Sequence, residues 1–134
     1  MISKDSIPLV SLDSMNETHF EELDIVNMLL TQLSNEEEFE TISNSFEKLI
    51  QHIQEHFSIE ERLMQEFRYP SYNMHRAEHT KVLNEARLNE MQWRNKKDRD
   101  ALVEYLEENI AVWLDQHIKA MDTPMADFIS ALQK

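Results

Sequence analysis

The sequence predicts an all-α protein: an antiparallel up-down-up-down four-helix bundle with an extended N-terminal arm and a short C-terminal helix. Glycine is absent and proline occurs only at positions 8, 70 and 124, so turns that need a positive φ are scarce and long helices run uninterrupted. Apolar residues recur at intervals of three and four, which is the spacing of one helix face. The 134 residues suit a single domain, 1–134, with one hydrophobic core.

The first helix is predicted over residues 14–33. Ser14 and Glu17 have the spacing of a capping box, in which each side chain bonds to the other residue's backbone N–H. Residues 1–13, which include Pro8, are expected to form an extended arm over one end of the bundle. The inward face of this helix is formed by His19, Leu23, Val26, Leu30 and Leu33.

The second helix is predicted over residues 36–67. Ser34 and Glu37 provide another capping box at its start. Tyr69-Pro70 follows its end, because a residue before proline avoids the α region. Its apolar row comprises Ile42, Phe46, Leu49, Ile53, Phe57, Met64 and Phe67.

The third and fourth helices are predicted over residues 71–93 and 98–121. Ser71 can cap the third, and Thr123-Pro124 ends the fourth and begins a short helix over 124–132. Short connections make neighbouring helices antiparallel. The inward residues are His75, His79, Val82, Ala86 and Trp93 in the third helix, and Leu102, Leu106, Ile110, Trp113 and His117 in the fourth.

Composition excludes several classes of protein. Because there is no cysteine, disulfides, zinc-thiolate sites and iron-sulfur clusters are excluded. A net charge of −13 disfavours binding to nucleic acids and to anionic membranes. No signal peptide or membrane span is readable, so we expect a cytoplasmic protein. No feature of the sequence identifies a protein partner.

Five of the six histidines fall on the apolar faces of the predicted helices. Each buried imidazole needs partners for both ring nitrogens, which an apolar core cannot supply, whereas a metal ion satisfies one nitrogen of every ligand. The alternative is that these are ordinary core histidines or that they bind adventitious zinc. The five are His19, His56, His75, His79 and His117.

Spacing supports a metal site. His56 and Glu60 are four residues apart, as are His75 and His79, so each pair lies on one helix face within reach of a common centre. Imidazole and carboxylate ligands suit iron, manganese or zinc.

His117 and Asp122 are five residues apart, which places them about 140° apart around a regular helix. Asp122 can join the site only if the helix deforms or ends there. The break expected at Thr123-Pro124 supplies such an end. Five imidazoles and two carboxylates exceed what one metal needs. They match two octahedral metals bridged by the carboxylates and a hydroxide, with one position left for a small ligand.

These motifs resemble the hemerythrin family, and bacteriohemerythrins in particular. The ordered set H, H-x3-E, H-x3-H, H-x4-D is highly specific, and it extends over nearly the whole chain. The segments that match are Met15-Asn16-Glu17-Thr18-His19, His56-Phe57-Ser58-Ile59-Glu60-Glu61, Tyr69-Pro70, His75-Arg76-Ala77-Glu78-His79, and Trp113-Leu114-Asp115-Gln116-His117-Ile118 with Asp122.

The resemblance implies a non-haem di-iron protein that binds dioxygen reversibly for storage, delivery or sensing, and it favours an oxygen-binding protein over an enzyme. Two iron ions would share a bridging oxo or hydroxo group. One iron would be bound by His75, His79 and His117 and the other by His19 and His56, with Glu60 and Asp122 bridging. The resemblance also places Phe57, Trp113, Leu114 and Ile118 around the ligand pocket.

Glu22 and His52 are the departures from the family pattern that concern the site. Glu22 stands in the pocket region where an apolar residue is usual, and its place on the flank of the first helix favours solvent exposure. Otherwise Glu22 fills the open iron position or donates a proton, which indicates a di-iron enzyme or sensor acting on peroxide or nitric oxide. His52, one turn before His56, is expected to support a ligand or to be peripheral.

Overall fold

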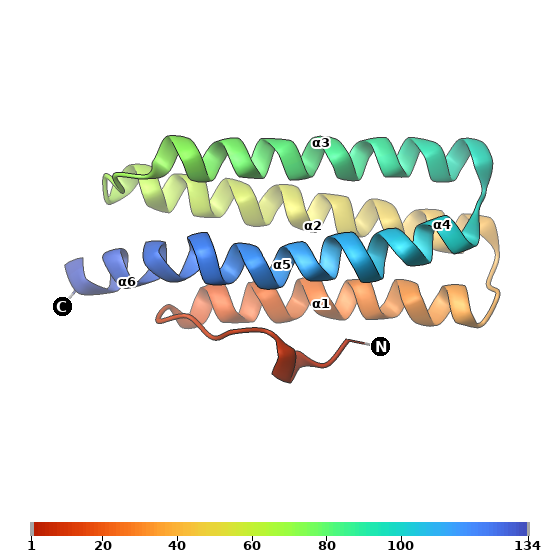
Figure 1. Ribbon diagram of the computed structural model, residues 1–134, viewed down its shortest axis with the longest axis horizontal. Helices are drawn as coiled ribbons and strands as arrows, with labels where there is room; N and C mark the ends of the chain where they lie inside the picture. Colours follow the sequence, from red (N-terminus) through yellow and green to blue (C-terminus); the bar gives the residue numbers. More distant parts are fainter. Residues whose placement is uncertain (1, 134) are drawn as a thin grey trace.

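The protein is a bundle of four antiparallel helical arms, which confirms the predicted fold class (Figure 1). The computed structural model describes residues 2–133, and within this range it contains helices and no strand. The first three arms are α1 (Asp13–Ser34), α2 (Phe39–Glu66) and α3 (Tyr72–Lys96), and a short 3-10 turn, η1 (Lys4–Ser6), precedes them.

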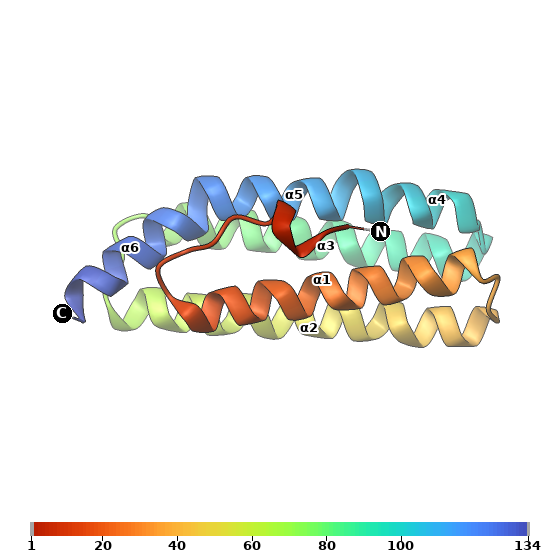
Figure 2. The same cartoon turned by 90° about the horizontal axis from the view of Figure 1, so that it is seen from below.

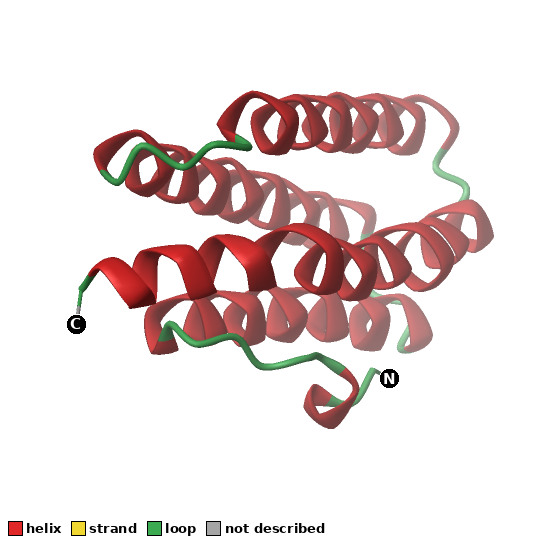
Figure 3. Ribbon diagram, turned by 60° about the vertical axis from the view of Figure 1, so that its left-hand side comes forward, coloured by secondary structure: helices red, strands yellow, loops and turns green. Residues whose placement is uncertain are grey.

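The fourth arm is one continuous helical run that changes width twice. Its segments are α4 (Arg99–Glu104), η2 (Tyr105–Ile110), α5 (Ala111–His117), η3 (Ile118–Asp122) and α6 (Thr123–Leu132). The segments η2 and η3 are π-helical, with hydrogen bonds to the residue five positions earlier. The expected break at Thr123-Pro124 is therefore absent, because the helix widens there and continues into α6 (Figure 3).

The helix ends differ from the capping pattern that the sequence predicts. No side-chain cap is formed at the start of α1 or α2, and Ser34 is the last residue of α1 and not the cap of α2. The chain reverses through Glu36, whose φ of 54° is left-handed, and Arg68 and Lys97 do the same after α2 and α3. These ordinary residues take the position after a helix that glycine usually occupies.

The core consists of two clusters of buried apolar side chains. The first fills the half of the bundle around Phe46, where the Trp93 indole donates a hydrogen bond to the Ser43 hydroxyl at 2.9 Å. The second includes Met15, Met64 and Met125, and some of its members stand close to the buried histidines in the sequence. The candidate metal site therefore lies inside apolar packing.

The N-terminal arm runs back along the bundle, beside α1 and the fourth arm (Figure 2), and does not cover one end as expected. Asn16 fixes it through two hydrogen bonds, since its side chain accepts from the Val10 N–H and donates to the Val10 carbonyl. Asn27 binds the backbone of Ile2 in the same way. The side chain of Val10 is buried, so the arm adds to the core.

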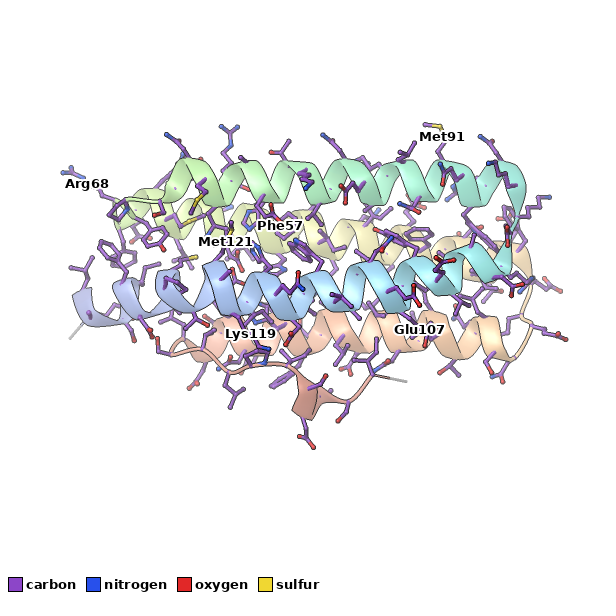
Figure 4. The ribbon with its side chains drawn as sticks, in the orientation of Figure 1. Phe57, Arg68, Met91, Glu107, Lys119 and Met121 are labelled. Carbon is purple, nitrogen blue, oxygen red and sulfur yellow. The ribbon has the colours of Figure 1, made fainter. Side chains whose placement is uncertain are left out.

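The outer faces of the helices are mostly polar, with isolated apolar side chains such as Met91, which points away from the bundle (Figure 4). Among residues 2–133, none of the helices combines the length and the hydropathy that crossing a lipid bilayer requires.

Truncation of Phe46 should test the packing of the first cluster without touching the candidate site. Phe46→Ala is expected to lower the free energy of unfolding by about 3–5 kcal/mol, because a fully buried ring is lost and a cavity remains. Urea denaturation measures this change. Met91→Ala, at a residue 58% exposed, is the control and should stay within about 0.5 kcal/mol of the parent. Equal stabilities of the two variants would contradict the assigned core.

Candidate metal centre

The seven side chains that the sequence predicts as metal ligands are all buried, each with 3% or less of its surface exposed. Every arm of the bundle contributes. They are His19 from α1, His56 and Glu60 from α2, His75 and His79 from α3, and His117 and Asp122 from the fourth arm.

These residues form two groups that share two carboxylates. In each group, one nitrogen or oxygen atom of every member lies within 4.8 Å of the corresponding atoms of the others. The three-histidine group is His75, His79, His117, Glu60 and Asp122, and the two-histidine group is His19, His56, Glu60 and Asp122. Each group has the donor set of a metal site.

Glu60 faces both groups. Its Oε1 atom lies 3.3 Å from Nε2 of His75 and 3.1 Å from Nε2 of His79. Its Oε2 atom lies 2.5 Å from Nε2 of His56. The two oxygens of this carboxylate are thus directed at different groups.

The two oxygens of the Asp122 carboxylate are likewise directed at different groups. Its Oδ1 atom lies 3.1 Å from the Nε2 atoms of His75 and of His117, and its Oδ2 atom lies 3.0 Å from Nε2 of His19. Each of the two carboxylates therefore directs one oxygen to either group.

Many buried atoms of the cluster lack a hydrogen bond within the described part of the chain. Although they lie near other polar atoms, the geometry of a hydrogen bond is not met, so their lone pairs converge on a shared space. A cation in that space would satisfy them, and the residues therefore fit a metal. On the shared side of the cluster, buried atoms without a hydrogen-bond partner include Nε2 of His19, Nε2 of His79, Oε1 of Glu60 and both carboxylate oxygens of Asp122.

Protons and metal compete for this cluster. Burial lowers the pKa of His75, but the neighbouring Asp122 and Glu60 carboxylates raise it to about 9. Burial raises the pKa of Glu60, and the opposing effect of His56 and the other histidines holds it well below its usual range. Without a metal, His75 therefore carries a proton near neutral pH. Metal binding must release this proton, so metal affinity falls as the pH falls.

The π-helical turn η3 brings Asp122 beside His117. Residues five positions apart lie on nearly the same face of a π-helix, whereas a regular α-helix separates them. Pro124 has no N–H to donate to the carbonyl four residues earlier, which favours a wider turn. The Thr123 N–H and hydroxyl both bond to the carbonyl of Ile118, the hydroxyl at 2.8 Å. Deformation of the helix, and not its end, places Asp122.

The predicted pocket residues pack against the histidines. Phe57, in the interior of the bundle (Figure 4), stacks on the His79 ring with centroids 3.9 Å apart. Trp113 stacks on His117 at 4.6 Å and donates a hydrogen bond to Glu78. The remaining two, Leu114 and Ile118, are fully buried in the second cluster. These residues surround the cluster with apolar surface.

Glu22 is buried, with 1% of its surface exposed, and so does not face solvent as its sequence position favours. Its Oε2 atom accepts a hydrogen bond from Nδ1 of His56 at 2.6 Å. Burial alone raises the pKa of Glu22, but His56 and His52 lower it to about 2 and keep the carboxylate ionised. The predicted exposure of Glu22 is therefore wrong, because α2 packs over the flank of α1 that carries this side chain.

Three further residues extend the cluster. Nδ1 of His52 lies 3.5 Å from Glu22 and its Nε2 lies 3.3 Å from Glu21, and His52 belongs to neither group of candidate ligands. Glu61 accepts a hydrogen bond from Nδ1 of His79 at 3.0 Å. No role for Glu21 or Glu61 follows from the sequence, because their partners lie on other helices and no spacing links them.

A hollow of about 140 Å³ reaches the two-histidine group between α1 and α2. It provides access for a small molecule from the surface, where Ile59 is 45% exposed. Its lining consists of Ser14, Met15, Thr18, His56, Ile59, Glu60 and Leu63.

A helical bundle with a buried cluster of histidines and shared carboxylates defines a class of protein that can bind metal within its core. Residues 8–129 match the family model described as the hemerythrin HHE cation binding domain. The chain is also 30% identical over 112 residues to a bacteriohemerythrin of Aquifex aeolicus (strain VF5), covering 84% of this chain and 85% of that protein.

The chain therefore belongs to the hemerythrin family, whose members bind a metal centre. No solved structure matches it.

Replacement of Pro124 should test the role of the π-helical turn. Pro124→Ala restores the missing N–H and favours a regular α-helix, which turns Asp122 away from His117. Metal affinity is expected to fall about tenfold or more in a competition titration with a chelator, a loss typical of disturbed ligand positioning. Pro8→Ala, in the N-terminal arm, is the control. Unchanged affinity in Pro124→Ala would show that the proline does not maintain the turn.

Proposed function

We propose that the two groups each bind one iron ion and that the protein binds dioxygen reversibly at this pair. The observation that supports the proposal best is the orientation of Glu60 and Asp122, each with one oxygen directed to either group. Carboxylates placed in this way suit two metals held side by side. Family membership supports the same conclusion.

The donor set favours iron. It contains imidazole and carboxylate only, as in non-haem iron sites, and the chain has no cysteine. Zinc in structural sites is tetrahedral and takes four ligands. Two groups that share both of their carboxylates do not resemble two separate tetrahedral sites. A bridging oxo or hydroxo group would complete the pair. Two ferrous ions supply both the electrons and the vacant coordination position that reversible dioxygen binding needs.

The two-histidine group is the proposed place for dioxygen. It has one histidine fewer than its neighbour, so one more coordination position remains for an external ligand. The hollow between α1 and α2 is lined by His56 and Glu60 of this group. The hollow and the remaining coordination position therefore both belong to the two-histidine group.

The surrounding side chains favour reversible binding. Phe57, Leu114 and Ile118 are buried around the cluster and exclude water, which slows loss of the ferrous state. Glu22 contacts Nδ1 of His56, whereas Nε2 of that ring faces Glu60, so the Glu22 carboxylate lies behind the ring. This position does not suit a proton donor to a ligand at the vacant position, which favours a binding protein over an enzyme acting on peroxide or nitric oxide.

Metal analysis tests the ligand assignment. We expect about two irons per chain in protein prepared without a histidine tag, and fewer than one in Asp122→Asn, because the amide removes a bridge shared by both ions. Asp115→Asn is the matched control, since Asp115 lies on the same arm and its carboxylate pairs with Lys119 at 3.1 Å. Less than about one iron per parent chain would refute the di-iron proposal.

Oxygen cycling tests the function. After anaerobic reduction, the protein should be nearly colourless, gain a visible charge-transfer band when oxygen is added, and lose it when oxygen is removed. Irreversible oxidation with no reversible band would contradict oxygen binding. Steady consumption of hydrogen peroxide or nitric oxide by the iron-loaded protein would instead support the enzyme alternative.

A further inference from the structure

Glu22 is a buried carboxylate that belongs to neither group of candidate ligands. A buried charge is costly unless it is paired, and its close partner is His56, 2.6 Å away. His52, at 3.5 Å, is the second partner, and it is itself held by the exposed Glu21. The chain therefore maintains a charge beside the two-histidine group at an energetic cost.

The contact with Glu22 determines how His56 presents its ring. A neutral imidazole carries one proton, and a carboxylate at Nδ1 keeps the proton on that nitrogen. In a metal-bound ring, the lone pair of Nε2 would then be available to a metal in the space where the groups converge, on the side of Glu60. An imidazole that donates to a carboxylate is also a more basic ligand, and its orientation is fixed.

The other group offers an internal comparison. Nδ1 of His79 donates to Glu61 at 3.0 Å, so each group has one histidine with a carboxylate behind it. Glu61 is 25% exposed and lies 3.6 Å from Nε of Arg76, so solvent and a cation both weaken its charge. Glu22 is shielded from solvent and faces only histidines among the contacts described. Because it is buried, its charge is screened by solvent less than that of Glu61.

We propose that Glu22 is a positioning residue that orients His56 as a metal ligand and whose buried charge stabilises the ferric state of iron in the two-histidine group. The inference rests on the proposed di-iron function and adds to it a determinant of redox behaviour. A negative charge near a metal favours the more positive oxidation state. Glu22 thus lowers the reduction potential on the side that faces the access hollow.

Two substitutions separate orientation from charge. Glu22→Gln keeps the size of the side chain and an oxygen that can accept from Nδ1, but removes the charge. Glu22→Leu removes both. Glu61→Gln is the matched control, because it changes the equivalent carboxylate of the other group. Circular dichroism verifies folding, and the near-isosteric glutamine variant keeps the test valid if the leucine variant does not fold.

Iron affinity and reduction potential are the two measurements. Chelator competition with Fe²⁺ should show a 10–100-fold weaker hold on one iron in Glu22→Leu and a smaller loss in Glu22→Gln. Both Glu22 variants should have a higher reduction potential by spectroelectrochemistry and a slower oxidation in air. Glu61→Gln should shift each quantity less.

Equal potentials in the parent, Glu22→Gln and Glu61→Gln would overturn the inference. The proposed function would still stand in that case if the parent bound two irons and cycled oxygen. A parent that bound no iron would overturn both. A structural role alone would change affinity without raising the potential of Glu22→Gln, so that result also counts against the inference.

Discussion

The rest of the structure depends on one constraint, the burial of five imidazoles and two carboxylates in a narrow helical core. Several of their nitrogens and oxygens converge without the hydrogen bonds that buried polar atoms require, as Nε2 of His19 does. An apolar bundle cannot satisfy such atoms, whereas bound cations would, and their binding would then stabilise the fold. The two apolar clusters supply the stability that allows this polar interior to be maintained.

The arms of the bundle place these side chains together through different helix geometries. Regular α-helix suffices where ligands are four residues apart, as for His75 and His79 on α3. The fourth arm must widen into a π-helix, because His117 and Asp122 are separated by five residues. A bridging carboxylate needs its oxygens directed at two centres, and the wide turn allows Asp122 this orientation. The shape of the helix is thus part of the chemistry of the site.

The sequence predicts the helices, and it singles out the seven residues that the structure gathers into two groups, because both depend on spacing along one chain. Its capping boxes at Ser14 and Ser34 are wrong, since the helix ends are set by how the chain reverses, as at Glu36 with its left-handed backbone. Glu22 was expected to face solvent and is buried. Its position on the flank of α1 said nothing of how closely α2 would pack over it.

By itself, the sequence determined the all-α class, the identity of the candidate ligands and the family, because periodicity and motif spacing are local properties of the chain. Only the tertiary structure decided which oxygen of Glu60 and Asp122 faces which group, that Glu22 lies behind His56, and that Glu61 supports His79. Those relations join residues on different helices. Their geometry depends on how the helices are rotated and packed against one another, which no spacing within a single helix encodes.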